Sequence, residues 1–331
     1  MASYNKTLLN LLSDGRFHSG TELAGELGGS RSLVWKHIRE LEALGLEIAA
    51  VPGRGYRALS PSELLDETAI REAMTTEAKA LLAALEIHDE IDSTNTRLMR
   101  ASMETPRGTV CLAEMQTAGR GRMGRDWISP FGANVYLSVL WRFEEASAAA
   151  GLSLAVGAAA VRALAGLGIP EVGLKWPNDL LWGDSKLGGI LLEVAGEANG
   201  PCKVVIGLGL NCRMADSEGK AIEQAWTDLF RIAGSAALRR NRLIAALLNE
   251  LLPLLRDFPE QGLGPHLRDW RRHHHMQGRE AVILQGNTEI RGRIADVTAE
   301  GLLALHCADG AVRHFASGDL RLRPIRDLSH G

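Results

Sequence analysis

A short segment near the middle of the chain combines three glycines with three arginines. Residues 119–125 read Gly-Arg-Gly-Arg-Met-Gly-Arg, so Arg120, Arg122 and Arg125 lie among glycines that let the backbone approach a ligand closely. Guanidinium groups match the planar oxygens of phosphate and carboxylate, and the spacing therefore predicts an anion-binding loop. Because like charges repel, we expect a loop that is mobile alone and ordered by a phosphate-bearing ligand.

The loop formally satisfies the dinucleotide-binding pattern Gly-x-Gly-x-x-Gly, but its surroundings do not. That pattern needs a strand before it and a helix after it. Residues 109–114 can form the strand, whereas Ser129-Pro130 leads into 135–141, which has the composition of another strand. A Rossmann site is therefore excluded, and a solvated basic turn is the alternative for the loop taken alone.

Two further segments could bind a polar ligand. Asp92-Ser-Thr-Asn95 precedes a helical pattern, so its side chains would lie beside unpaired N–H groups, either holding a ligand or only capping the helix. Residues 174–179, Leu-Lys-Trp-Pro-Asn-Asp, place a cation, an amide and a carboxylate in a stretch that Pro177 keeps out of a helix. Each segment alone could be purely structural.

Lys186 stands next to Leu187-Gly188-Gly189, where a ligand can approach the backbone. A cation there could stabilise a carboxylate or an α-phosphate, although a surface charge is the plainer interpretation of one lysine. Residues 190–194 and 204–211 are apolar and read as buried strands. The sequence thus predicts a sheet that carries these polar groups.

The first sixty residues form a separate pattern. Helices are expected over 6–13, over 19–27 with a capping box at Ser19, and over 30–44, and short strands over 46–51 and 56–59. This is a winged helix-turn-helix, in which the third helix would enter the major groove of DNA. The side chains expected to touch DNA are Ser30, Arg31, Ser32, Lys36, His37, Arg39 and Arg54. A helical interaction module without DNA contacts is the alternative.

Composition limits the class of protein. The 331 residues, 46% hydrophobic and 23% charged with a net charge of -3, are typical of a globular chain of two or three domains with no global attraction to nucleic acid or membrane. Four scattered cysteines fit a reducing compartment, and the N-terminus does not resemble a signal peptide. The apolar run 146–169 is expected to be a buried core helix, so we expect a cytoplasmic protein without a membrane span.

The end of the chain alternates like small β structure. Strands are expected over 281–284, 288–297, 302–306, 312–315 and 320–322, which together suggest an SH3-like barrel. A helix is expected over 62–74 after the first unit. The run Arg271–His275 could suggest a metal site, but consecutive helical residues point in different directions, and a polar helix end is favoured.

Taken together and in order, these segments closely resemble the bifunctional biotin protein ligases that are also biotin operon repressors. The matching pieces span nearly the whole chain, and the arginine-glycine loop combined with Lys175-Trp-Pro-Asn-Asp179 is far more specific than either part. The resemblance implies an α+β fold. It comprises a winged helix-turn-helix at 1–60, a mixed-sheet ligase domain at 61–275 like class II aminoacyl-tRNA synthetases and biotin-lipoate ligases, and a barrel at 276–331.

The resemblance implies a two-step enzyme. Biotin and ATP with Mg²⁺ give biotinyl-5'-AMP, and biotin then passes to a lysine of the biotin carboxyl carrier protein of acetyl-CoA carboxylase. The implied biotin-binding residues are Ser93, Thr94, Asn95, Gln116, Arg120, Gly121, Arg122 and Lys186. Those implied for ATP or the adenylate are Arg120, Arg122, Arg125, Trp127, Asn178, Lys186, Asn211 and Trp226. The implied catalytic residues are Lys186, Arg122, Asp179 and Lys175, with Asp179 also a metal ligand.

The chemistry suits these residue types, because joining a carboxylate to a phosphate brings two anions together and fixed cations must offset their repulsion. A homodimer promoted by biotinyl-5'-AMP would bind operator DNA. Met123 departs from the family pattern, which often has arginine there, so the resemblance leaves open how tightly this chain retains the adenylate. The alternatives are a ligase without DNA binding, a non-enzymatic ligand-sensing transcription factor, and a lipoate ligase.

Overall fold

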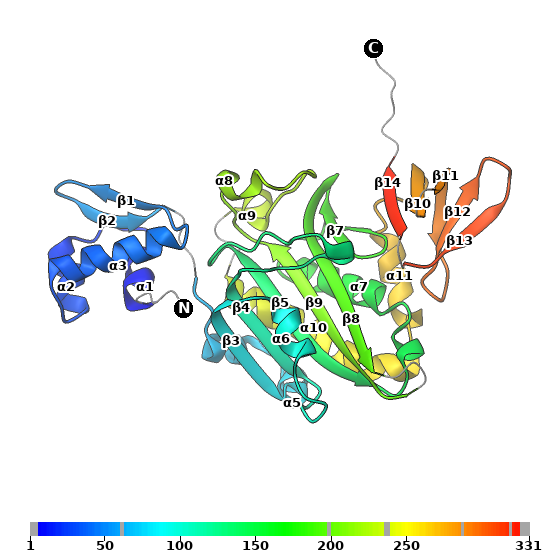
Figure 1. The fold of residues 1–331 in the computed structure, drawn as a ribbon, viewed down its shortest axis with the longest axis horizontal. Coiled ribbons are helices and arrows are strands. Elements are labelled where there is room, and N and C mark those ends of the chain that lie inside the picture. Colours follow the sequence, from blue (N-terminus) through cyan, green and yellow to red (C-terminus); the bar gives the residue numbers. More distant parts are fainter. Residues whose placement is uncertain are drawn as a thin grey trace, which may run out of the picture.

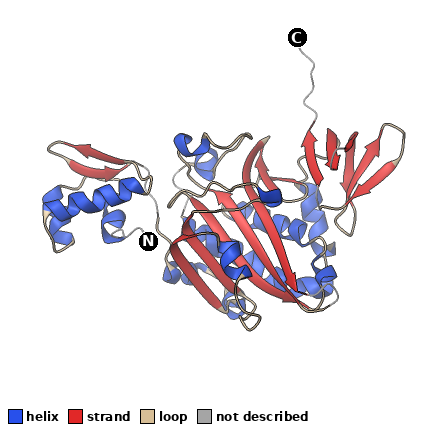
Figure 2. Cartoon of the chain, in the orientation of Figure 1, coloured by secondary structure: helices blue, strands red, loops and turns tan. Residues whose placement is uncertain are grey.

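The computed structural model describes residues 6–59, 63–196, 200–234, 239–285, 288–317 and 320–324. Figure 1 shows a small N-terminal unit, a large central sheet covered by helices, and a C-terminal β unit. Figure 2 shows that the C-terminal unit is built from strands, whereas the other two mix helices and strands. This is the α+β architecture expected from the sequence.

The N-terminal unit is a winged helix-turn-helix. Its elements are α1 (Lys6–Leu12), α2 (Gly20–Glu26), α3 (Arg31–Ala43), β1 (Ile48–Val51) and β2 (Gly55–Ala58). Ser19 and Glu22 form the predicted capping box at the start of α2, and the Ser30 hydroxyl accepts a hydrogen bond from Leu33 N at the start of α3. Leucines of α1 and α2 pack against the apolar face of α3.

The central sheet has seven strands in the order β3-β4-β5-β9-β8-β7-β6. Their bounds are β3 (Ala84–Ile91), β4 (Thr109–Gln116), β5 (Asn134–Phe143), β6 (Gly173–Lys175), β7 (Asp179–Trp182), β8 (Ser185–Gly196) and β9 (Cys202–Asn211). Only the β3–β4 pair is parallel among these described strands, so the sheet is mixed, as expected. The middle strand, β9, is paired with β5 along the full length of both strands.

Helices cover the two faces of this sheet unequally. One face carries α7 (Leu152–Gly166), α10 (Arg240–Gln261) and α11 (Gly264–Arg272), with α4 (Glu67–Ala73) and α5 (Thr76–Leu81) against α10. The other face carries the short α6 (Thr94–Met99), which contacts β4, β5, β8 and β9. Because side chains alternate along a strand, apolar residues point to the large helical layer while glycines and polar residues point to the α6 face.

Two expected helices differ from those observed. The helix expected over 62–74 begins at Glu67, capped by the Asp66 side chain, and α5 follows it without having been predicted. The run expected as one helix over 146–169 is a 3₁₀ turn, η2 (Ala146–Ala149), and then α7, because Gly151 takes a left-handed conformation between them. Residues 146–166 are apolar and long enough to span a membrane, yet α7 is buried in the core as predicted.

The C-terminal unit is a five-stranded antiparallel sheet in the order β13-β12-β11-β10-β14. The strands are β10 (Glu280–Gln285), β11 (Thr288–Val297), β12 (Leu303–Cys307), β13 (Val312–Phe315) and β14 (Leu320–Pro324), close to those expected. It contacts the central domain through Trp176, whose indole N–H donates to Gly301 O at 3.2 Å. Two short helices, α8 (Asp216–Gly219) and α9 (Leu229–Ala233), follow β9 in the central domain.

Candidate active site

A cavity of about 450 Å³ opens on the α6 face of the central sheet. This volume suits a small organic ligand. Every residue expected to bind biotin or adenylate lines it, namely Ser93, Thr94, Asn95, Gln116, Arg120, Gly121, Arg122, Arg125, Trp127, Asn178, Lys186, Asn211 and Trp226. Lys175 and Asp179 do not line it, but Asp179 Oδ1 lies 2.8 Å from Lys186 Nζ, and Lys175 is the strand partner of Asp179 between β6 and β7. The fold therefore brings segments that are more than a hundred residues apart in the sequence together around one cavity.

One corner of the cavity is a hydrogen-bonded array at the start of α6. Ser93 caps this helix, and the backbone N–H of Thr94 donates to Gln116 Oε1 at 2.9 Å. Gln116 Nε2 donates to Ser129 Oγ at 2.9 Å, which fixes the orientation of its amide. Ser138 Oγ lies 2.8 Å from Thr94 Oγ1 and 2.6 Å from Asn95 Oδ1. The corner is rigid and polar, and it can recognise the polar head of a ligand.

Two glycines of β9 make room for this corner. A β-carbon on Gly207 would lie 2.3 Å from Asn95 Oδ1, and one on Gly209 would lie 2.6 Å from the Trp127 indole. Either distance is shorter than a real contact, so both positions require glycine. Trp127 lines the cavity, and its indole N–H is buried and has no hydrogen-bond partner within the described residues.

The arginine-glycine loop lies across the cavity and is fixed at two points. An Arg120 Nη2 atom lies 3.0 Å from Glu193 on β8, and Arg122 Nη1 donates to Asn178 Oδ1 at 3.2 Å. Arg122 also donates to the carbonyl of Ser317 in the C-terminal unit. The middle of the loop is a single 3₁₀ turn, η1 (Arg122–Gly124), with Met123 at a left-handed φ of 57°. The predicted mobility of this loop stays a prediction.

Lys186 and Asp179 form an ion pair at the back of the cavity. Lys186 Nζ lies 2.8 Å from Asp179 Oδ1, and it also lies 5.4 Å from the centroid of the Trp127 ring. Burial lowers the pKa of the neighbouring Lys175, Asp179 opposes this effect, and the charges of Lys186 and Arg125 add to it. Positive charge is thus concentrated here, as an anionic ligand would require.

Trp226 forms the far wall, on the segment before α9. The residue before it is hydrogen-bonded to the backbone of Lys186: Lys186 N donates to Ala225 O at 2.9 Å. The indole packs so tightly on Gly219 that a β-carbon there would overlap it. The Arg231 guanidinium lies 4.1 Å from the ring centroid. Asn211 Nδ2 donates to Thr227 O at 3.0 Å and so ties β9 to the same segment.

Sequence reasoning missed three residues that hold the site together. Ser129 and Ser138 complete the polar corner, and Glu193 contacts both Asn95 and Arg120. A signal for Glu193 existed in the sequence. It is the single acidic residue of β8 and lies two and four positions after Leu191 and Gly189, on the face that carries the cavity.

The residues expected to touch DNA lie on the described part of the N-terminal unit. Ser30 caps α3 and lies 2.7 Å from Ser32 Oγ, His37 pairs with Glu40, and Arg39 pairs with Glu42. Trp35, on the same helix, is 55% exposed and is not a core residue. Arg54 lies against the ring of Phe17 at 4.5 Å. Arg31 and Lys36 are also exposed on α3.

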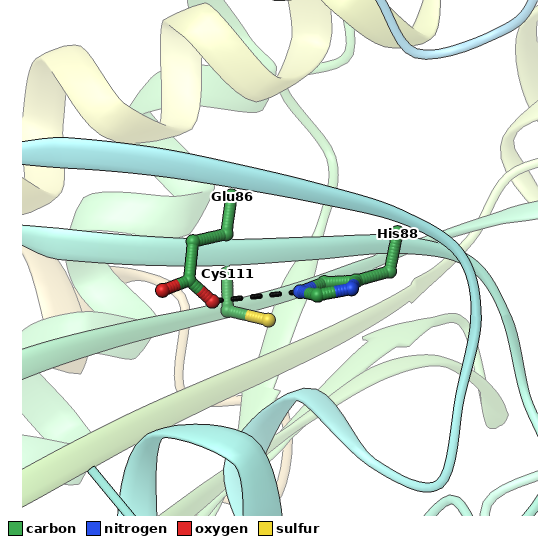
Figure 3. Close-up of side chains that lie close together, drawn as sticks. All are labelled: Glu86, His88 and Cys111. Atoms are coloured by element: carbon green, nitrogen blue, oxygen red, sulfur yellow. Dashed lines mark hydrogen bonds and ion pairs between the residues drawn. The ribbon is translucent and has the colours of Figure 1, made fainter.

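A second group of potential ligand atoms lies outside the cavity, where Glu86, His88 and Cys111 approach one another on β3 and β4 (Figure 3). The position of each of these side chains is explained without a metal ion. Glu86 pairs with Arg97 at 2.8 Å and with His88 at 3.4 Å. Burial raises the pKa of the Cys111 thiol to about 12, so the thiol is protonated at neutral pH. This group is an ion-pair network beside an apolar cysteine.

Comparison with known families places the chain by its three parts. Residues 88–211 match the biotin/lipoate A/B protein ligase family, residues 5–57 match an HTH domain, and residues 278–323 match the biotin protein ligase C terminal domain. The chain therefore belongs to the biotin protein ligases.

More particularly, it belongs to the bifunctional ligase/repressors. It is 41% identical over 318 residues to the bifunctional ligase/repressor BirA of Salmonella typhimurium, covering 96% of this chain and 97% of that protein. The biotin--[acetyl-CoA-carboxylase] ligase of Mycobacterium tuberculosis is 36% identical over 268 residues, covering 78% of this chain and 96% of that protein. The Aquifex aeolicus biotin protein ligase in complex with biotin and ATP superposes with a TM-score of 0.63 at 27% identity, covering 74% of this chain and 100% of that chain.

Proposed function

We propose that this chain is an ATP-dependent biotin protein ligase. Biotin's carboxylate attacks the α-phosphorus of ATP, pyrophosphate leaves, and biotinyl-5'-AMP forms. A lysine amine of a biotin carboxyl carrier protein then attacks the acyl carbon, and AMP leaves. The single observation that carries this proposal is the cavity that brings a rigid polar corner, a cationic loop, Lys186 and two tryptophans together.

We propose that the polar corner holds the ureido head of biotin. Its hydrogen bonds fix Thr94 and Gln116 in one orientation, which suits a small ligand with both donors and acceptors. Gly121, Arg120 and Arg122 would cover biotin from the loop, and Lys186 would contact its carboxylate. This assignment leaves the opposite end of the cavity for the nucleotide.

We propose that the adenylate lies along the loop toward Trp226. Arg120, Arg122, Arg125 and Lys186 would offset the charge on the α-phosphate. Trp226 would stack on adenine, with Asn178 and Asn211 nearby. No protein nucleophile is required, because positioning and charge stabilisation suffice for the displacement.

Magnesium would arrive with the nucleotide as MgATP. The one carboxylate expected to bind it, Asp179, is paired with Lys186 at 2.8 Å. A single carboxylate already paired with an ammonium does not make a magnesium site, so no step is assigned to a metal held by the protein. Lys175 and Lys186 would instead supply fixed positive charge behind the reacting carboxylate.

The ligase proposal is tested by incubating the chain with biotin, ATP, magnesium and a biotin carboxyl carrier domain. A carrier heavier by one biotinyl group supports it, and an unmodified carrier contradicts it. Replacing biotin by lipoate in a pyrophosphate-exchange assay tests the lipoate alternative. Exchange with lipoate alone would reassign the substrate.

We propose that the chain is also a biotin-responsive repressor that acts in the cytoplasm. The exposed cations of α3 and the complete helix-turn-helix support DNA binding. Two such units on a homodimer promoted by biotinyl-5'-AMP would require an operator with two half-sites. The proposed domains are residues 1–60, 61–275 and 276–331. DNA binding that is enhanced by biotin plus ATP supports this role. The absence of DNA binding would mean that the chain is a ligase only.

A further inference from the structure

Glu193 links the wall of the cavity to the loop that covers it. Its Oε2 atom accepts a hydrogen bond from Asn95 Nδ2 at 2.8 Å, and Arg120 Nη2 lies 3.0 Å from both of its carboxylate oxygens. The Glu193 side chain is 23% exposed, and that of Arg120 is 43% exposed. Glu193 does not line the cavity itself, so it acts on a ligand through these two neighbours.

The contact with Asn95 fixes an amide orientation. Both Asn95 Nδ2 hydrogens are used, one by Glu193 and one by Leu191 O at 3.3 Å, while Oδ1 accepts from Ser138 Oγ at 2.6 Å. A flipped amide would place its oxygen against the Glu193 carboxylate, which is strongly unfavourable. Gly207 leaves the space that this orientation needs.

The contact with Arg120 opposes charge repulsion in the loop. Arg120 shares the cavity with Arg122, Arg125 and Lys186, so without a counter-charge it would move toward solvent. A carboxylate on the rigid strand β8 offsets this repulsion and holds the guanidinium over the cavity. An arginine has five donors, so several remain for a phosphate oxygen.

We infer that Glu193 is a positioning residue that holds the arginine-glycine loop closed over the adenylate and orients Asn95 beneath it. This inference rests on the proposed ligase function. It assigns two separable effects to one side chain. The charge of Glu193 retains the adenylate through Arg120, and its hydrogen bond shapes the biotin site through Asn95.

Conservative and non-conservative variants separate these effects. Glu193→Gln keeps an oxygen that accepts from Asn95 but removes the charge, so release of biotinyl-5'-AMP should be about tenfold faster with the KM for biotin near its original value. Glu193→Ala removes both contacts, so the KM for biotin should also rise about tenfold. Glu250→Gln is the matched control, because Glu250 pairs with Arg162 at 2.8 Å on the helical face.

Release of separately synthesised biotinyl-5'-AMP is measured by stopped-flow tryptophan fluorescence, and KM and kcat by biotin-dependent pyrophosphate exchange. Arg120→Gln and the double variant E193Q/R120Q should release the adenylate at the same rate. Once Arg120 is replaced, the Glu193–Arg120 ion pair is already lost, so replacing Glu193 as well has no further effect on release. The inference would be overturned if the original chain and Glu193→Gln released the adenylate at the same rate. It would also be overturned if the fold-change in the release rate of the double variant equalled the product of the two single-variant fold-changes. An original chain that does not bind the adenylate would instead contradict the proposed function.

Discussion

The ammonium group of Lys186 lies 2.8 Å from the carboxylate of Asp179, and their side chains are only 13% and 18% exposed. The pair is therefore held at the back of the cavity by a contact that water screens weakly. Asp179 lies on β7 beside Gly189 of β8, so the sheet itself fixes this geometry. When an anionic ligand enters, Lys186 can contact it while Asp179 holds the lysine in place.

This geometry makes Lys186 the residue whose loss should be most damaging. Lys186→Ala should abolish biotin-dependent pyrophosphate exchange, because a fixed cation next to the two anions is removed and Asp179 is left unpaired. Lys186→Arg should keep part of the activity. Lys79→Ala, on the exposed face of α5, is the control. Exchange at the original rate in Lys186→Ala would contradict the assigned role.

The two glycines of β9 give a prediction about shape. Gly209→Ala should displace the Trp127 indole and Gly207→Ala should displace Asn95, so each should weaken biotin binding by at least about tenfold in calorimetry. Gly166→Ala is the control, because a β-carbon at the end of α7 would meet no atom within 4 Å. Unaltered affinity in the Gly207 and Gly209 variants would mean that the ligand lies elsewhere.

Much of the fold and site could be predicted from the sequence, since local signals were strong. Ser19 and Ser30 cap helices as expected, and the arginine-glycine loop reaches the cavity that Gln116 and Lys186 also line. Alternation along β8 indicates which face Glu193 lies on, but its role also depends on β8 lying against α6, a contact that no local pattern specifies.

The start of α4 was also misplaced for a physical reason. Ser62 and Asp66 are both good capping residues, and the choice between them depends on tertiary contacts. The backbone N–H of Asp66 bonds to Asn241 Oδ1 at 3.0 Å, which holds Asp66 in an extended conformation from which the helix begins. Such contacts between distant residues cannot be read from a helical pattern.

A buried ion pair joins the linker after the winged unit to the sheet. Arg240 Nη2 lies 2.6 Å from Glu114 Oε2, and their side chains are 4% and 2% exposed. Glu114 Oε1 also accepts from Leu65 N, and Arg240 donates to Glu63 O. Removing one partner leaves the other charge buried, so Arg240→Gln should destabilise the chain by about 3–5 kcal/mol in urea unfolding.

The double variant R240M/E114Q removes both charges and is the informative comparison. It should recover a large part of the lost stability, because no unpaired charge remains. If its loss in free energy of unfolding equals the sum of the losses in the two single variants, the hydrogen bonds to the linker, and not the charge pair, account for most of the stabilisation. The linker contacts would then be the main structural role of Arg240.

DNA binding should depend on the exposed cations of α3. Lys36→Ala and Arg31→Ala should each weaken binding to a mixed-sequence duplex and reduce the slope of log affinity against log salt by about 1, because each removes one phosphate contact. Carrier biotinylation should not change. Unaltered salt slopes in both variants would indicate that the winged unit does not bind DNA through α3.

The winged unit also contains a buried histidine whose charge should make its stability depend on pH. The Asp14 carboxylate raises the pKa of His18; burial opposes this, and Glu22 adds to the increase. The ring nitrogens lie 3.0 Å from Asp14 and 2.8 Å from Glu22. Because the folded pKa is above the ordinary 6.5, this stabilisation is complete below about pH 6.5 and is lost as the pH rises through the folded value.

Amide hydrogen exchange, corrected for the intrinsic pH dependence of exchange rates, tests this directly in the full chain. Protection of α1 and α2 should fall as the pH rises above about 6.5, and His18→Gln should remove most of that change by removing the titrating group. Amides of β5 and β9 serve as an internal reference within each sample. Equal loss of protection in the original chain and His18→Gln would show that another group controls the pH response, and His18 would then be a packing residue.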